Sequence, residues 1–234
     1  RWSFRAMRVD IITCVPKIFD RFLTESIIGK AIKNQIVSIH IHDIRNYGIG
    51  KYRQIDDSPY GGGAGMILMP EPLAFSIESC TKQRKYDEVI FFLPEGNKIE
   101  QSYVNRASQF ENILMVCGHY KGIDQRIVDL YATQILSIGD FIVTGGEIPA
   151  MLLSDAITRL IPGAIGNEQS ALEDSFQDNL LSPPVYTRPP LFNELAVPKV
   201  LLSGDHKKIS EWRMEQAYNK TSQLRPDLLH SEEG

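Results

Sequence analysis

Strand-like and helix-like segments alternate along most of the chain. A β-branched run at 8–15 and apolar runs at 88–93 and 112–117 are typical of strands, the last two of buried ones, and apolar and polar residues alternate over 37–44, which also predicts a strand. Apolar residues recur with near-helical spacing over 19–34 and again over 150–161. This alternation predicts an α/β fold with a mostly parallel sheet and flanking helices.

The regular pattern weakens after about Pro162. Residues 163–176 are polar, contain glycine and show no strong periodicity, which is typical of a linker. A proline-rich segment and a helical segment at 206–221 follow. We therefore predict four parts: an N-terminal extension (1–6), a first domain (7–165), a flexible linker (166–177) and a small C-terminal helical domain (178–234).

Composition narrows the class of protein. With 234 residues, 43% of them hydrophobic, the chain can bury a sizeable core, and its sequence shows no apolar run of the length that a membrane span needs. The formal charge of −4 predicts no bulk attraction to nucleic acid, so such a partner needs a local basic patch. The three cysteines are widely spaced, and His40 and His42 share a strand face without a third ligand. These spacings predict reduced cysteines, a cytoplasmic protein and no metal site.

Four glycine-bearing segments mark places where the backbone can approach a ligand closely: 59–66, 91–98, 116–124 and 137–149. The first lacks the Lys-Ser/Thr ending of a Walker motif, so by spacing alone a turn or mobile loop is the simpler interpretation. The second and third follow predicted strands directly, and we expect the strand at 88–93 to stop at Pro94. Ligands bind at the carboxyl ends of strands in α/β sheets, so these loops together predict a binding site.

Six motifs occur in one order along the chain: PYGGGAGM, CGHYKGID, SIGDFIVTGGEIPA, RLIPG, EDSF and YTRP. Together they closely resemble the bacterial tRNA (guanine(37)-N1)-methyltransferases of the SPOUT class, from Met7 to about Leu229. The resemblance implies a trefoil-knotted fold, S-adenosylmethionine as methyl donor, tRNA as partner and a homodimer with active sites at the subunit interface. It also implies that the segment 137–149 threads the knot and wraps the donor's adenine.

The resemblance carries the donor site onto three loops of this chain. The residues that it implies are Phe91, Phe92, Leu93, Pro94, Gly96, Gly118, Ile138, Gly139, Asp140, Phe141, Ile142, Val143, Gly145, Gly146 and Pro149. Two positions depart from the usual family pattern. Lys121 stands where many members have Glu, and Leu93 where many have Ser, so no role is assigned to the Lys121 side chain.

Methylation of N1 of guanine requires a base that removes the N1 proton and a donor that stabilises charge on O6. The resemblance assigns the base to Asp174 and the guanine-stabilising group to Arg159. A second hydrogen-bonding group is expected at Ser175. Further substrate contacts are assigned to Gly61, Gly62 and Gly63 in the glycine loop, and to His206, Arg213 and Lys220. The last three recur every seven residues on one helix face, a pattern that a solvated face explains equally well.

Two other functions remain open at this stage. One is a SPOUT methyltransferase that modifies another nucleotide, and the EDSF carboxylate argues against a ribose methylase, which has no ring nitrogen to deprotonate. The other is a non-catalytic RNA-binding module, against which the presence of both Asp174 and Arg159 argues. The residues do not decide whether Mg²⁺ assists the reaction, which tRNAs are used or how a dimer is oriented.

Overall fold

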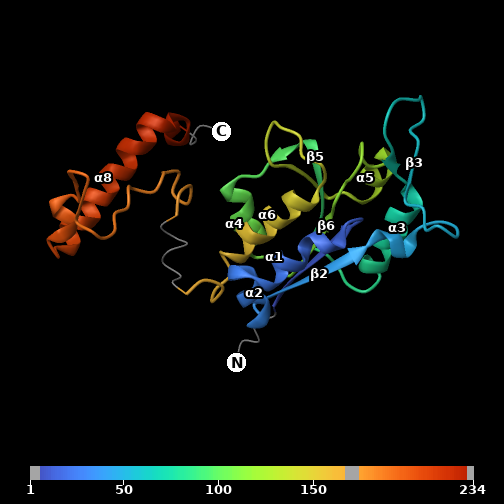
Figure 1. The fold of residues 1–234 in the computed structure, drawn as a ribbon, viewed down its shortest axis with the longest axis horizontal. Coiled ribbons are helices and arrows are strands. Elements are labelled where there is room, and N and C mark those ends of the chain that lie inside the picture. Colours follow the sequence, from blue (N-terminus) through green and yellow to red (C-terminus); the bar gives the residue numbers. More distant parts are fainter. Residues whose placement is uncertain (1–5, 167–173, 231–234) are drawn as a thin grey trace. The chain divides into compact units, whose positions relative to one another are not determined.

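The computed structural model describes residues 6–166 and 174–230 (Figure 1). Two compact units make up the chain, Arg1–Gly166 and Asn167–Gly234, and each is described by itself. Residues 167–173, which fall within the expected linker, lie outside the described residues. Within the described parts, no helix combines the length and hydropathy that crossing a bilayer requires.

Five parallel strands form the sheet of the first unit. They are β1 (Met7–Thr13), β2 (Val37–Asp43), β5 (Glu88–Lys98), β6 (Asn112–Val116) and β7 (Gln134–Ser137), in the spatial order β2-β1-β6-β5-β7. In the centre of the sheet Ile11 pairs with Ile41 on one side and Met115 on the other. The predicted α/β fold with a mostly parallel sheet is thereby confirmed. Because all five strands run the same way, the loops that follow them emerge at one edge.

Side chains alternate between the two faces of the sheet and build two cores. On β1, Val9 and Ile11 belong to one core, whereas Ile12 belongs to the other. The first core includes residues of α2 (Ser26–Lys33), α4 (Gln101–Ala107) and α6 (Glu147–Thr158), with α1 (Asp20–Thr24) packed against it. The second core includes residues of α3 (Pro70–Thr81) and α5 (Gln125–Tyr131). Helices therefore cover both faces, which explains why the strands are apolar on both sides.

The helical periodicity over 19–34 produces two helices instead of one. After the 3₁₀ helix η1 (Pro16–Phe19), α1 ends at Thr24, Glu25 is extended and Ser26 has φ +58°. Helix α2 then folds back so closely that a Cβ on Gly29 would lie 2.4 Å from the carbonyl oxygen of Thr24. The apolar spacing survives this break, and so sequence periodicity alone did not reveal it.

Strand β5 does not stop at Pro94, contrary to the prediction. It pairs with β7 as far as Phe92, bulges, and resumes pairing at Asn97. Gly96 makes this return feasible, because a Cβ at that position would lie 2.6 Å from the backbone nitrogen of Leu136. The bulge lifts Leu93 and Pro94 away from the ladder and toward the loop edge.

Smaller elements frame the glycine loop of the first unit. The short strands β3 (Asp56–Asp57) and β4 (Ile67–Leu68) pair antiparallel on either side of it, and the 3₁₀ helix η2 (Ile44–Tyr47) precedes it. A bridge between Leu68 and Ile123 ties this hairpin to the loop that follows β6.

The second unit is built around helix α8 (His206–Leu224), with β8 (Leu191–Phe192) and β9 (Leu195–Ala196) as a short antiparallel pair. The 3₁₀ helices η3 (Lys199–Leu202) and η4 (Pro226–His230) flank α8. Asp205 caps the helix by accepting a hydrogen bond from the backbone N–H of Lys208 at 3.2 Å. The buried hydroxyl of Thr221 accepts from the backbone N–H of Leu181 at 2.9 Å, which anchors the preceding segment on the helix.

Candidate active site

The bulge of β5 and the loops after β6 and β7 line a cavity of about 220 Å³ at the carboxyl edge of the sheet. The wall from β5 contributes Phe92, Leu93 and Pro94, and the wall after β6 begins at Gly118. The remaining expected donor-site residues that border the cavity are Ile138, Gly139, Phe141, Ile142, Val143, Gly145, Gly146 and Pro149. Most of the donor site inferred from the sequence is thus brought together around one hollow.

Three of the expected donor residues lie outside the cavity lining. Phe91 is fully buried in the second core, because its strand position points to the opposite face from Phe92. Gly96 packs on the backbone of β7. Asp140 is exposed, and its carboxylate accepts a hydrogen bond from the Lys98 ammonium at 2.6 Å.

The segment between the end of β7 at Ser137 and the start of α6 at Glu147 forms neither strand nor helix. Gly139 has φ +141°, and a Cβ there would lie 2.7 Å from the ring of Phe141. The Ser137 hydroxyl donates to the Gly139 carbonyl and accepts from its N–H, closing a tight turn. Phe141 and Ile142 stay 58% and 78% exposed at the mouth of the cavity. Apolar side chains are therefore held beside the hollow instead of in the core.

At the other end of this loop, Gly146 lies against the β6 loop. Its N–H donates to the Gly118 carbonyl at 2.8 Å, and a Cβ on Gly146 would lie 2.7 Å from the Cα of Cys117. Helix α6 begins at the next residue, with Pro149 in its first turn. The cavity wall is consequently continuous between the two loops.

Several cavity residues were not singled out from the sequence. They are His119, Tyr120, Gly122, Leu136, Ser137 and Thr144, together with Lys121, which had been left without a role. All but Leu136 lie inside the quoted motifs CGHYKGID and SIGDFIVTGGEIPA, so membership of a motif was the available signal. Nothing in the local pattern of polar and apolar residues distinguished them.

Lys121 connects the cavity to the glycine loop. A Cβ on Gly63 would lie 3.3 Å from the Lys121 ammonium nitrogen, and one on Gly65 would contact the carbon atoms of the same side chain. Gly61, Gly62 and Gly63 all have positive φ and are exposed. The expected substrate loop therefore lies beside a cation that borders the cavity.

The two expected catalytic residues belong to different units. Arg159 follows helix α6 in the first unit, is half-buried, and donates its backbone N–H to the Asp155 carbonyl at 3.1 Å. Asp174 is exposed and belongs to the second unit. Its neighbour Ser175 is hydrogen-bonded to Ser182 through both the Ser182 backbone N–H and the side-chain hydroxyl.

The second unit contains a larger cavity of about 950 Å³ that Asp174, His206 and Arg213 border. Proline, valine and leucine side chains supply much of the remaining lining. Lys220 is not part of this lining, and its ammonium donates to the carbonyl of Ser182 at 3.0 Å. The heptad spacing therefore unites His206 and Arg213 at one surface but gives Lys220 a structural contact.

A buried cluster of charged groups lies on β1 and β2, apart from the cavity residues. The Asp10 carboxylate accepts hydrogen bonds from Arg8, His42 and Tyr86. Burial acts to raise the pKa of Asp10, but these three hydrogen bonds outweigh it and hold that pKa well below its usual range. The hydrogen bond to Asp10 in turn raises the pKa of His42 to about 9.

Comparison with known proteins gives one consistent result. The family model described as tRNA (Guanine-1)-methyltransferase TrmD matches residues 7–231. A protein of Christiangramia forsetii named tRNA (guanine-N(1)-)-methyltransferase is 51% identical over 226 residues, covering 97% of this chain and 100% of the relative. Proteins of the same name from Chlorobium chlorochromatii and Bacteroides fragilis are 50% and 48% identical, each over 223 residues and 95% of this chain, and over 96% and 99% of their own lengths.

Proposed function

This chain belongs to the tRNA (guanine-1)-methyltransferase family, and on that premise we propose that it methylates N1 of guanine in tRNA. The methyl group comes from S-adenosylmethionine, and the target is the guanine immediately 3′ of the anticodon, position 37. The observation that carries the proposal is the cavity at the carboxyl edge of the parallel sheet, bounded by the loop of residues 138–146.

The cavity has the chemistry that an adenosyl group needs. Apolar side chains such as Phe92, Leu136 and Ile138 offer contacts to a flat adenine ring. The glycines at 118, 139, 145 and 146 carry no side chain, so the backbone of the cavity wall can approach the ring closely, and main-chain N–H and C=O groups of these loops can recognise its polar edge. The bound donor supplies a methyl group on a positively charged sulfur, so the protein has only to orient the partners and exclude water.

Removal of the guanine N1 proton is assigned to Asp174, whose carboxylate is the base. As the proton leaves, negative charge spreads to O6, and the Arg159 guanidinium stabilises it there. The nitrogen lone pair then forms the bond to the methyl carbon while the carbon–sulfur bond breaks. Ser175 serves as a further hydrogen-bonding group for the guanine.

A homodimer with shared active sites is part of the proposal. Arg159 and Asp174 belong to different compact units, and the connection between them runs through residues 167–173. We infer that Asp174 of one subunit meets the donor bound in the other, in a SPOUT-type trefoil-knotted domain. The C-terminal helical domain then binds tRNA, while the linker brings Asp174 to the active site of the other subunit.

The tRNA is held by local charge, since the chain as a whole carries −4. Arg213 and His206 border the cavity of the second unit and are assigned to phosphate contacts. Lys220 retains its assignment to the substrate, although its hydrogen bond to Ser182 also supports the fold. The glycine loop at 61–63 is assigned to contacts with the target nucleotide. Because the proposed substrate is tRNA, we propose that the protein is cytoplasmic.

The deciding experiment uses labelled S-adenosylmethionine and two tRNA transcripts that differ only in having G or A at position 37. Label should enter the G37 transcript alone, at N1. Transfer to both transcripts would identify a methyltransferase for another nucleotide. Donor binding by calorimetry without transfer to either transcript would instead identify a non-catalytic RNA-binding module. Adding and chelating Mg²⁺ in the same assay decides whether that ion assists.

A further inference from the structure

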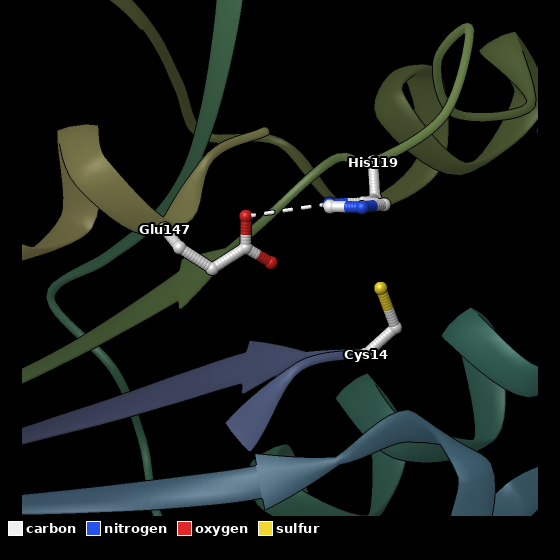
Figure 2. A group of neighbouring side chains, drawn as sticks. All are labelled: Cys14, His119 and Glu147. Carbon is white, nitrogen blue, oxygen red and sulfur yellow. Dashed lines mark ion pairs between the residues drawn. The ribbon is translucent and has the colours of Figure 1, made fainter. Parts of the chain in front are cut away.

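Cys14, His119 and Glu147 meet at one point although they are far apart in the chain. Cys14 follows β1, His119 follows β6, and Glu147 is the first residue of α6. One side-chain ligand atom from each lies within 4.8 Å of the other two, and Figure 2 shows the three side chains converging. Cys14 is 4% exposed and Glu147 3%. Among the residues that the structure describes, this is the one group of His, Cys, Asp or Glu side chains with such an arrangement.

The Glu147 carboxylate is held in position by a second layer of contacts. Its Oε1 accepts a hydrogen bond from the Thr13 hydroxyl at 2.7 Å. That hydroxyl in turn accepts from the backbone N–H of Val15 at 3.0 Å. One carboxylate oxygen is thereby fixed, and Oε2 remains directed toward His119. Hydrogen bonds of this kind orient carboxylates that bind metals.

The His119 side chain presents an unsatisfied nitrogen to the same point. Nδ1 is buried and has no hydrogen-bond partner among the described residues, and it lies 3.5 Å from Glu147 Oε2. A buried nitrogen that lacks a hydrogen-bond partner destabilises the fold, so the missing partner of Nδ1 requires an explanation. The space is preserved by Gly145, where a Cβ would lie 2.3 Å from Glu147 Oε2 and 2.7 Å from His119 Nδ1.

The Cys14 thiol completes the set of three ligand atoms. A cysteine binds a metal ion as the thiolate, so binding releases the thiol proton. A divalent cation would displace that proton and turn the sulfur into a strong ligand.

We propose that Cys14, His119 and Glu147 form a binding site for a borderline-soft divalent cation, Zn²⁺ or a close analogue. Sulfur, imidazole nitrogen and carboxylate oxygen are the three ligand types that Zn²⁺ takes in proteins, whereas Mg²⁺ avoids thiolate. The charges balance, since +2 from the ion, −1 from the thiolate and −1 from the carboxylate sum to zero. A buried site of this composition carries no net charge.

The geometry requires a modest contraction. Zinc-to-ligand distances of about 2.0–2.3 Å put neighbouring ligand atoms about 3.5 Å apart in a tetrahedron. The ligand atoms lie within 4.8 Å of one another, so side-chain rotations that close about 1 Å suffice. Three protein ligands leave the fourth position open. His119 and Gly145 both border the cavity at the carboxyl edge of the sheet, and we expect the ion to enter from that side.

Such an ion would tie the end of β1 to two walls of the donor cavity. The site does not rest on the proposed methyl transfer, because the three residues and their contacts exist whatever the cavity binds. Its expected consequence is a stabilised cavity rim. The full-length protein should therefore melt at a higher temperature when Zn²⁺ is added after chelation.

Cobalt provides the direct test, since Co²⁺ bound to a thiolate gives a near-ultraviolet charge-transfer band that oxygen and nitrogen ligands do not. The chelator-treated full chain should show this band on titration with Co²⁺ and lose it when Zn²⁺ displaces the cobalt. Cys14→Ser should abolish the band and weaken Zn²⁺ binding at least about tenfold. Cys80→Ser is the matched control, because Cys80 is also 4% exposed and lies outside the cluster.

Two results would overturn the proposal. One is a wild-type protein that shows no thiolate band and no change in melting temperature with Zn²⁺. The other is Zn²⁺ binding that Cys14→Ser leaves unchanged, which would assign the ion to exposed histidines elsewhere. If Cys14→Ser fails to fold, His119→Gln decides, because that side chain is 26% exposed and its replacement leaves the core filled. Unaltered Co²⁺ spectra and Zn²⁺ affinity in His119→Gln would equally exclude the site.

Discussion

Gly145 and Glu147 are packed so closely that a Cβ on the glycine would lie 2.3 Å from the carboxylate Oε2. The same Cβ would also come within 3.0 Å of the Gly118 carbonyl oxygen, which belongs to the facing loop. Separations below 3.0 Å are essentially never seen for real Cβ atoms, so the wall of the cavity at the carboxyl edge of the sheet depends on glycine at this position.

Gly145→Ala should therefore destabilise the protein and weaken donor binding together. Inserting a methyl group into a filled site costs about 1–3 kcal/mol, and the displaced wall belongs to the cavity. Thermal unfolding and calorimetric titration with S-adenosylmethionine measure the two effects. Gly166→Ala is the control, because a Cβ there meets nothing within 4 Å among the residues that the structure describes. Equal melting temperatures and donor affinities for both variants would contradict the close packing.

Asp174→Asn should bind the donor normally and lose turnover by about 10²–10⁴-fold, the usual contribution of a general base. The amide keeps the size of the side chain but cannot accept the N1 proton. Single-turnover methylation of a G37 transcript measures the loss. Asp178→Asn is the matched control, since Asp178 borders the same cavity of the second unit. Near-normal single-turnover rates in Asp174→Asn would remove Asp174 from the mechanism.

The pair of Asp10 and His42 should make stability fall with rising pH. The folded pKa of His42 is about 9, above its ordinary value of 6.5, because the Asp10 carboxylate, and secondarily Cys80, hydrogen-bond to it. The stabilisation from protonated His42 is complete below about pH 6.5 and is lost as the pH rises through 9. We expect the free energy of unfolding to drop by about 3 kcal/mol across this window.

Urea unfolding at several pH values checks this expectation, with His42→Gln as the comparison. The variant should be less stable than the wild type at pH 6 and approach it at pH 9. A wild-type pH dependence that matches the variant's throughout this range would show that the pair contributes no such stabilisation.

Shared active sites can be detected by mixing two inactive proteins. Asp174→Asn damages the proposed base, whereas Gly139→Val damages the donor loop, because a Cβ on Gly139 would lie 2.7 Å from the Phe141 ring and the residue has φ +141°. In a heterodimer with shared sites, both lesions fall in one site and the other stays intact. Subunit exchange should then restore up to about half of the activity of a wild-type dimer. Mixtures that exchange subunits without regaining activity would count against shared sites.

The pattern of apolar and polar residues predicted the α/β class, and the motif resemblance indicated most of the residues that line the cavity of the first unit. β1, β5 and β6 are rich in buried apolar residues, and β2 alternates apolar and polar residues, so these four strands could be predicted from the sequence. The loop of residues 138–146 was recognisable because it lies in one of the six motifs that resemble the methyltransferase family. Features of this kind depend on residues that are close together in the chain, and they can therefore be predicted from the sequence.

Only the tertiary structure decided which distant residues meet. The apolar periodicity is continuous over 19–34, but the chain forms two helices with an extended Glu25 between them, because Gly29 lets α2 pack against Thr24. Phe91 lies outside the cavity because its side chain is on the face of the strand that packs into the second core. Gly96 allows β5 to pair with β7 again beyond Pro94. The cluster of Cys14, His119 and Glu147 had no spacing that a motif could match. Its members converge because β1 and β6 are adjacent parallel strands and α6 begins at the edge where both end.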